Sequence, residues 1–148
     1  MRNTLHERDF HAWANEQAQL LRAGNLSDAD IENIAEEIES MGRAEKRELV
    51  SRLEVLLMHL LKWQFQPERR GRSWTNTIRV QRNRLDSHMD DNPSLKAQLL
   101  AAISVAYENA KIEAAAETDM DEAVFPASCP CSAEQIFDRH FWPDAPAI

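Results

Sequence analysis

Glutamate and histidine side chains are the residue types in this sequence that could perform acid–base or metal chemistry. Glu36, Glu37 and Glu39 fall in one run, and His59 lies in the following apolar run. Helical bundles often build metal sites from inward-facing Glu-x-x-His pairs, a spacing that is absent here. At about 100° per residue only Glu37 flanks the apolar stripe, so no metal site is predicted. His59 is interpreted as a hydrogen-bonded imidazole at the edge of the core, with ligand and general base as alternatives.

Arg82 raises a different question, because it falls between Ile78 and Leu85 on a stripe that should be apolar. A buried guanidinium needs an acceptor, since an uncompensated buried charge is strongly destabilising. We therefore hypothesise that Glu37 pairs with Arg82 and that the pair fixes the register of neighbouring helices. Because perturbed ionisable groups collect at active sites, Glu37, His59 and Arg82 are also the candidate catalytic cluster.

A run of arginines gives a second candidate site, for nucleic acid. Its weak candidate contacts are Arg69, Arg70, Arg72 and Arg79, and the whole basic segment extends to Arg84. Arginines bind phosphates, and the flanking Trp63 and Trp74 could stack on bases. The pI of about 5.1 argues against a dedicated nucleic-acid binder. Residues 1–42 contain nine acidic and three basic side chains and residues 43–84 four and eleven, so the favoured alternative is internal neutralisation.

Cysteine content and hydropathy limit the cellular compartments in which this protein is expected. Only one residue separates Cys129 from Cys131, so a disulfide between them would not link distant parts of the fold. Two thiols are also too few for a structural metal site, which needs four ligands. They are interpreted as packed thiols in a reducing compartment. No apolar run reaches the roughly 20 residues of a membrane span, and the segment 1–9 lacks a secretory signal. The expectation is a cytoplasmic protein with no membrane partner and, without a phosphate-binding glycine loop, no cofactor.

Helical periodicity dominates the elements that must position these residues. Only three glycines occur and no alternating β-branched run is present, which predicts an all-α protein. Helices are expected over about 7–23, 27–42, 44–66, 73–90 and 94–117, with a short one over 132–139. Gly24 and Gly42 are expected to end the first two, and the expected N-caps are Ser27, Ser73, Ser94 and Ser132.

The expected architecture is a single domain, 1–148, forming a compact bundle of about five helices. One helix is expected to bury Ile31, Ile34, Ile38 and Met41. The next is expected to bury a leucine stripe that includes Leu49, Leu53, Leu56 and Leu60. The proline-rich segment 124–148 is expected to wrap over the bundle, pinned by Phe125, Ile136, Phe137, Phe141 and Trp142.

Several short motifs resemble one bacterial family. They are Asp9-Phe10-x-x-Trp13, the run from Glu36 to Gly42, His59-Leu60-Leu61-Lys62-Trp63, Gln66-Pro67, Ser73-Trp74, Gln81-Arg82, Pro93-Ser94-Leu95 and a tail of the form Phe125-Pro126…Cys129-Pro130. Together they are similar to the twenty-ninth of the catalogued domains of unknown function, over about residues 5–143. The resemblance implies a compact α-helical fold and carries no activity, substrate or cofactor.

The sequence therefore favours a non-catalytic protein-interaction module, because no catalytic motif is present. Its partner is expected to be another protein or a second copy of the chain. Two alternatives stay open: nucleic-acid binding through Arg69–Arg84, and an enzyme or metal-binding bundle using Glu37, His59 and Arg82.

Overall fold

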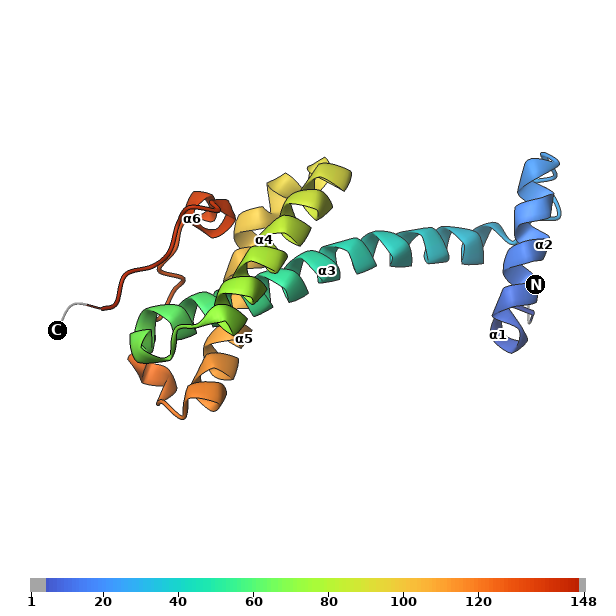
Figure 1. The fold of residues 1–148 in the computed structure, drawn as a ribbon. Helices are drawn as coiled ribbons and strands as arrows, with labels where there is room; N and C mark the ends of the chain where they lie inside the picture. Colours follow the sequence, from blue (N-terminus) through green and yellow to red (C-terminus); the bar gives the residue numbers. More distant parts are fainter. Residues whose placement is uncertain (1–4, 147–148) are drawn as a thin grey trace. The chain divides into compact units, whose positions relative to one another are not determined.

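Helices make up the fold, as the sequence predicts, and no strand occurs among residues 5–146, which the computed structural model describes (Figure 1). Residues 1–4 and 147–148, the ends of the expected domain 1–148, lie outside the described residues. The main elements are α1 (Leu5–Arg8), α2 (Phe10–Arg22), α3 (Ile31–Phe65), α4 (Arg72–Asp91), α5 (Leu99–Thr118) and α6 (Ala133–Phe137). Short 3₁₀ helices are η1 (Pro67–Arg69), η2 (Pro93–Gln98) and η3 (Glu122–Val124). The chain divides into two compact units, 1–44 and 45–148, and α3 contributes to both.

Asp30 ties α2 to the start of α3 in the N-terminal unit. The buried Trp13 donates from Nε1 to its Oδ2 at 3.1 Å, and the buried Gln17 accepts from its backbone N–H at 2.7 Å. Burial alone would raise the pKa of the Asp30 carboxyl, but hydrogen bonds from Asn33 and Trp13 more than offset it and lower that pKa. The connection between these helices is therefore held by specific polar contacts.

Gly24 ends α2 as predicted, whereas Gly42 ends nothing. Gly24 has φ +72°, and the N–H groups of Gly24 and Asn25 bond back to the carbonyls of Leu21 and Leu20, the double closure of a Schellman motif. The expected break at Gly42 and the expected cap at Ser27 are wrong: α3 runs unbroken from Ile31 to Phe65. A single interior glycine weakens a helix by about 1 kcal/mol relative to alanine, too little to end a run of good helix formers.

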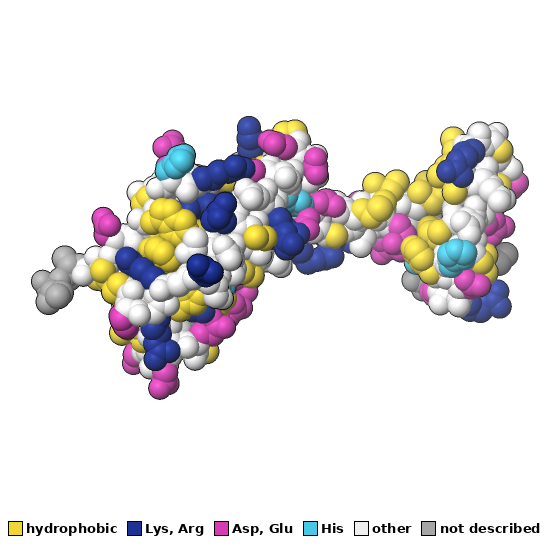
Figure 2. Space-filling model, viewed as in Figure 1, with side chains coloured by type: hydrophobic (Ala, Val, Ile, Leu, Met, Phe, Trp, Pro, Cys, Tyr) yellow, Lys and Arg dark blue, Asp and Glu magenta, His cyan; other side chains and the backbone are white. Residues whose placement is uncertain are grey.

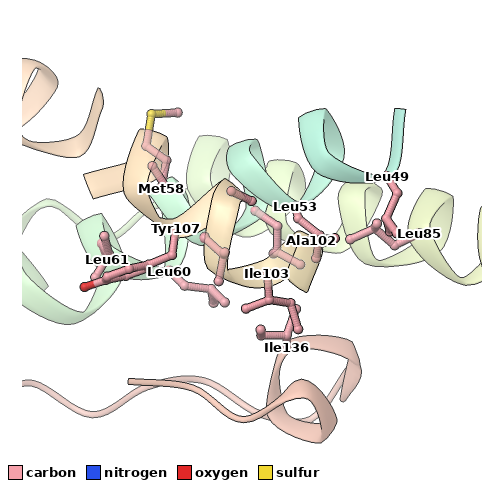
Figure 3. Close-up of a cluster of buried hydrophobic side chains, with 14 of the residues drawn as sticks. Leu49, Leu53, Met58, Leu60, Leu61, Leu85, Ala102, Ile103, Tyr107 and Ile136 are labelled. Atoms are coloured by element: carbon pink, nitrogen blue, oxygen red, sulfur yellow. The ribbon is translucent and has the colours of Figure 1, made fainter. Parts of the chain in front are cut away.

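Three long helices and α6 share one apolar core in the unit 45–148 (Figure 3). Each buries side chains at helical spacing: Leu49, Leu53, Leu56 and Leu60 from α3, Ile78 and Leu85 from α4, Ala102, Ala106 and Ala110 from α5, and Ile136 from α6. The small alanine side chains let the α5 backbone approach its neighbours closely. The predicted leucine stripe of α3 is thus confirmed as core.

The C-terminal segment is fastened to this core at several points. Phe125 is buried, and Phe137 and Trp142 pack against the core. Tyr107 donates its hydroxyl to the Pro126 carbonyl at 2.6 Å. The predicted cap at Ser132 is confirmed, since Ser132 and Gln135 form a reciprocal capping box on α6.

The two other expected serine caps are wrong. Helix α4 begins at Arg72 with Gly71 at its N-cap and no side-chain cap bond, so Ser73 lies inside its first turn. Pro93 opens η2, because its fixed φ suits the first helical position, and α5 begins only at Leu99.

None of the described helices is long and apolar enough to cross a membrane.

Candidate functional site

Glu37 lies in the N-terminal unit, where its Oε1 is 2.8 Å from Nε2 of His6. The His6 ring packs edge-on against Trp13 at 4.5 Å between ring centroids and against Phe10 at 5.5 Å. This hydrogen bond, with the aromatic rings around it, joins α1 to α3. Glu37 was predicted to flank the apolar stripe of its helix, and its side chain contacts His6 of α1.

His59 is half-buried on α3 and bonds within its own helix. Its Nδ1 lies 2.8 Å from the Val55 carbonyl, which can only accept, so Nδ1 carries the proton. Burial lowers the pKa of the His59 imidazole, and the charge of Lys62 lowers it further. Lys62 itself pairs with Glu117 of α5 at 2.8 Å. The interpretation of His59 as a hydrogen-bonded histidine agrees with this geometry.

Arg82 is 1% exposed, and its acceptors are backbone carbonyls. Its Nε donates to the Ile136 carbonyl at 2.9 Å and its Nη2 to the Gln135 carbonyl at 3.2 Å, both on α6. The hypothesised pair of Glu37 with Arg82 is therefore wrong, since each has other partners. The carbonyls of this short helix accept two hydrogen bonds from the guanidinium without burying a second charge.

The three residues of the candidate catalytic cluster thus have three separate sets of partners: His6 for Glu37, the Val55 carbonyl for His59, and α6 for Arg82. Nothing in these contacts assembles a nucleophile, a base and an orienting group.

The four candidate nucleic-acid contacts differ in their surroundings. Arg69, Arg72 and Arg79 are exposed. Arg70 is half-buried: its Nε donates to the Trp63 carbonyl at 2.8 Å, its guanidinium lies 4.9 Å from the Trp63 ring centroid, and its Nη2 reaches the Pro143 carbonyl at 3.4 Å. Arg70 therefore holds the loop after α3 against the C-terminal segment.

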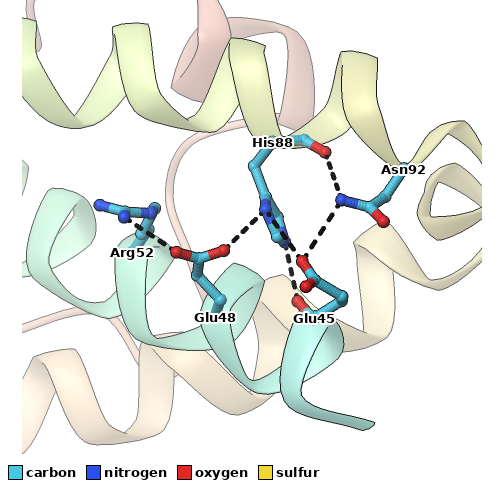
Figure 4. Close-up of polar contacts among 5 residues, drawn as sticks. All are labelled: Glu45, Glu48, Arg52, His88 and Asn92. Atoms are coloured by element: carbon cyan, nitrogen blue, oxygen red, sulfur yellow. Dashed lines mark hydrogen bonds and ion pairs between the residues drawn. The ribbon is translucent and has the colours of Figure 1, made fainter. Parts of the chain in front are cut away.

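A polar cluster that the sequence analysis missed joins α3 to α4 (Figure 4). Buried His88 has Nδ1 2.8 Å from a Glu48 carboxylate oxygen and 3.6 Å from one of Glu45, while its Nε2 donates to the Glu45 carbonyl at 2.8 Å. Arg52 holds the other Glu48 oxygen at 2.9 Å. The ligand atoms of His88, Glu45 and Glu48 lie within 4.8 Å of one another, a spacing at which they could hold a metal ion.

This cluster left a signal in the sequence. His88 follows Leu85 by three residues and precedes Met89, so it falls on the inward stripe of α4. The helix pattern could have found it as a buried histidine, but not its partners on α3.

A family model described as Domain of unknown function DUF29 matches residues 5–142. The chain is a member of the DUF29 family. No curated protein and no solved structure matches it. Membership agrees with the resemblance seen in the sequence motifs, and it assigns no chemistry to the residues above.

The two cysteines of this DUF29 chain are half-buried against the core. The Cys129 thiol donates to the Cys131 carbonyl at 3.4 Å. Burial raises the pKa of both thiols, that of Cys131 to about 11. A thiol of that pKa is about one-thousandth thiolate at pH 8, which makes it a poor nucleophile and a poor metal ligand without rearrangement.

We expect native DUF29 thiols to react slowly with a disulfide reagent such as DTNB at pH 8, at least tenfold slower than free cysteine. The same protein in urea should release two equivalents at the rate of free cysteine. Immediate release of both equivalents from the folded protein would contradict this assignment.

Proposed function

We propose that this DUF29 protein is a non-catalytic protein-interaction module whose N-terminal unit binds a basic amphipathic helix of a partner protein. The observation that carries the proposal is an apolar stripe on the first turns of α3. Ile31, Ile38 and Met41 are 52%, 58% and 61% exposed, although their spacing places them on one helix face. The sequence analysis expected this stripe to be core, and that expectation is wrong for these three side chains.

Further exposed apolar side chains lie in the same unit, and hydrophobic surface is also visible on the unit 45–148 (Figure 2). On and after α2, Phe10, Leu21 and Leu26 are 50%, 42% and 59% exposed. Solitary exposed leucines are ordinary, but a repeated apolar stripe on one helix resembles the anchors of helix-in-groove recognition.

The charge around the stripe indicates the chemistry of the partner. Glu32 and Glu39 are exposed and lie about 80–100° around the helix from Ile31, beside the stripe. Residues 1–44 contain nine acidic and four basic side chains. An acidic rim beside apolar anchors favours a partner helix that carries leucines on one face and Lys or Arg beside them.

The proposal is tested with two labelled helical peptides that have identical leucine positions, one with Lys and Arg at the polar positions and one with Glu. Fluorescence anisotropy should show binding of the basic peptide and none of the acidic one. The double variant Ile38→Ser, Met41→Ser should weaken binding at least tenfold, because each apolar side chain that becomes buried contributes about 1.5 kcal/mol or more.

The matched control is Leu100→Ser on α5, a change at a side chain that is 75% exposed and lies outside the N-terminal unit. It should leave the affinity for the basic peptide unchanged. Equal binding of both peptides, no binding of either, or an equal loss in the control would overturn the proposal. A dimer detected by light scattering and abolished by the double variant would also overturn it, because the occupant would then be a second copy.

An enzyme built on Glu37, His59 and Arg82 has less support, because these residues have separate partners.

A further inference from the structure

Arg82 is one of the residues that line a pocket in the unit 45–148. The pocket has a volume of about 300 Å³ and is lined by Arg79, Arg82 and Asn83 of α4 and by Arg139 and Trp142 of the C-terminal segment. Positions 79, 82 and 83 share a face of α4, since they are three and four residues apart. The pocket therefore gathers three guanidinium groups from two segments distant in sequence.

One polar atom at this pocket has no partner. Nε and Nη2 of Arg82 donate to α6 carbonyls, but Nη1 is buried and has no hydrogen-bond acceptor among the described residues. Buried donors are nearly always satisfied, and an unsatisfied charged donor is especially unfavourable. The Trp142 ring, with its centroid 5.7 Å from the guanidinium carbon, covers another side of the group.

The acidic groups nearby neutralise this charge only partly. Asp86 Oδ2 lies 3.4 Å from Nη2 of Arg139, a loose and exposed pair. The charge of Asp138 also acts on Arg82, without a hydrogen bond between them. Arg79 is exposed and lines the same pocket. Three guanidinium groups thus face two carboxylates, which leaves a net positive pocket.

We infer that this pocket binds the phosphate group of a small phosphomonoester. The ligand oxygens pair with the forks of Arg79 and Arg139, which match the geometry of phosphate oxygens, and the incompletely compensated charge of Arg82 adds to the attraction. A monoester carries nearly two negative charges near neutral pH, more than a carboxylate or a phosphodiester, and so suits a site with three arginines.

The size of the pocket limits the rest of the ligand. A volume of about 300 Å³ lies at the lower end of the range for small-molecule sites, enough for a phosphate with a sugar-sized group. Trp142 offers an apolar wall for that group. A nucleic-acid strand would instead present phosphodiesters, each with a single charge.

The test is isothermal titration calorimetry of the full chain with inorganic phosphate, ribose 5-phosphate and ribose, and with a single-stranded oligonucleotide. Inorganic phosphate and ribose 5-phosphate should bind saturably, and ribose should not bind. Binding should strengthen as pH rises through about 6, where the monoester loses its second proton.

Exposed positions supply variants that leave the core intact. Arg79→Gln and Arg139→Gln should each weaken binding of ribose 5-phosphate about tenfold, the equivalent of one charge-assisted contact. Asp86→Asn should tighten binding, because it frees Arg139. Arg84→Gln is the matched control, an exposed arginine of α4 outside this pocket, and should leave the affinity unchanged.

Three results would overturn the inference. They are the absence of saturable binding by either phosphate compound, an equal loss of affinity in Arg84→Gln, and tighter binding of the oligonucleotide than of ribose 5-phosphate. The last outcome would assign the arginines to a nucleic-acid surface.

Discussion

Arg82→Met should lower the free energy of unfolding of the unit 45–148 by about 3 kcal/mol. Methionine has nearly the length of the arginine stem but no donor, so the carbonyls of Gln135 and Ile136 lose their buried hydrogen bonds. Each hydrogen bond from a charged donor contributes about 1.5–3 kcal/mol, and the removed burial penalty of the guanidinium offsets part of the loss. Urea unfolding followed by far-UV circular dichroism measures the change.

Because the hydrogen bonds lost in Arg82→Met go to α6, the damage should be local at first. Limited proteolysis should cut the segment after α5 sooner in Arg82→Met than in the wild type. Arg84→Met, a change at an exposed side chain two residues further along α4, should stay within about 0.5 kcal/mol of the wild type. If both variants unfold alike, the contacts from Arg82 to α6 contribute no net stability.

Arg82 also shows where sequence reasoning about the site stops. Its position between Ile78 and Leu85 was enough to predict burial, and it is 1% exposed. Its acceptors could not be predicted, because every residue carries a carbonyl and the sequence does not distinguish those that face an arginine. The carboxylate chosen as partner, Glu37, is held by His6 in the other unit. Side-chain type indicates a need for a partner, while the fold decides which atom meets it.

Two glycines show that the neighbouring residues also decide where a helix ends. Gly24 ends α2, and it is followed by Asn25 and, two residues later, by Ser27, both poor helix formers that favour turns. Gly42 is followed by Arg43 and a run of good helix formers, and α3 continues through it. The residues after a glycine, more than the glycine itself, decided whether the helix ended, because helix propagation is cooperative. The helical type of these segments followed from periodicity, whereas the expected division between 27–42 and 44–66 was wrong.

Periodicity alone did not determine which apolar stripe becomes core. Helix α3 carries two such stripes, one with Ile38 and Met41 and one with Leu49 and Leu53, and both have the spacing of an amphipathic helix. Only the second is covered by α4, α5 and α6. The pattern indicates that a helix face is apolar. Which elements cover that face depends on long-range packing.

Leu53→Ala and Met41→Ala on this one helix should therefore differ by several kcal/mol. Leu53 is fully buried, so its truncation leaves a cavity and should lower the free energy of unfolding by about 3 kcal/mol, within the usual 2–5 for Leu→Ala. Met41 is 61% exposed, and its truncation should change that energy by less than about 0.5 kcal/mol. Leucine and methionine have similar helix propensity, so the difference between the variants isolates burial. Both are measured by urea unfolding under one set of conditions, and equal losses would mean that the first stripe is covered in solution.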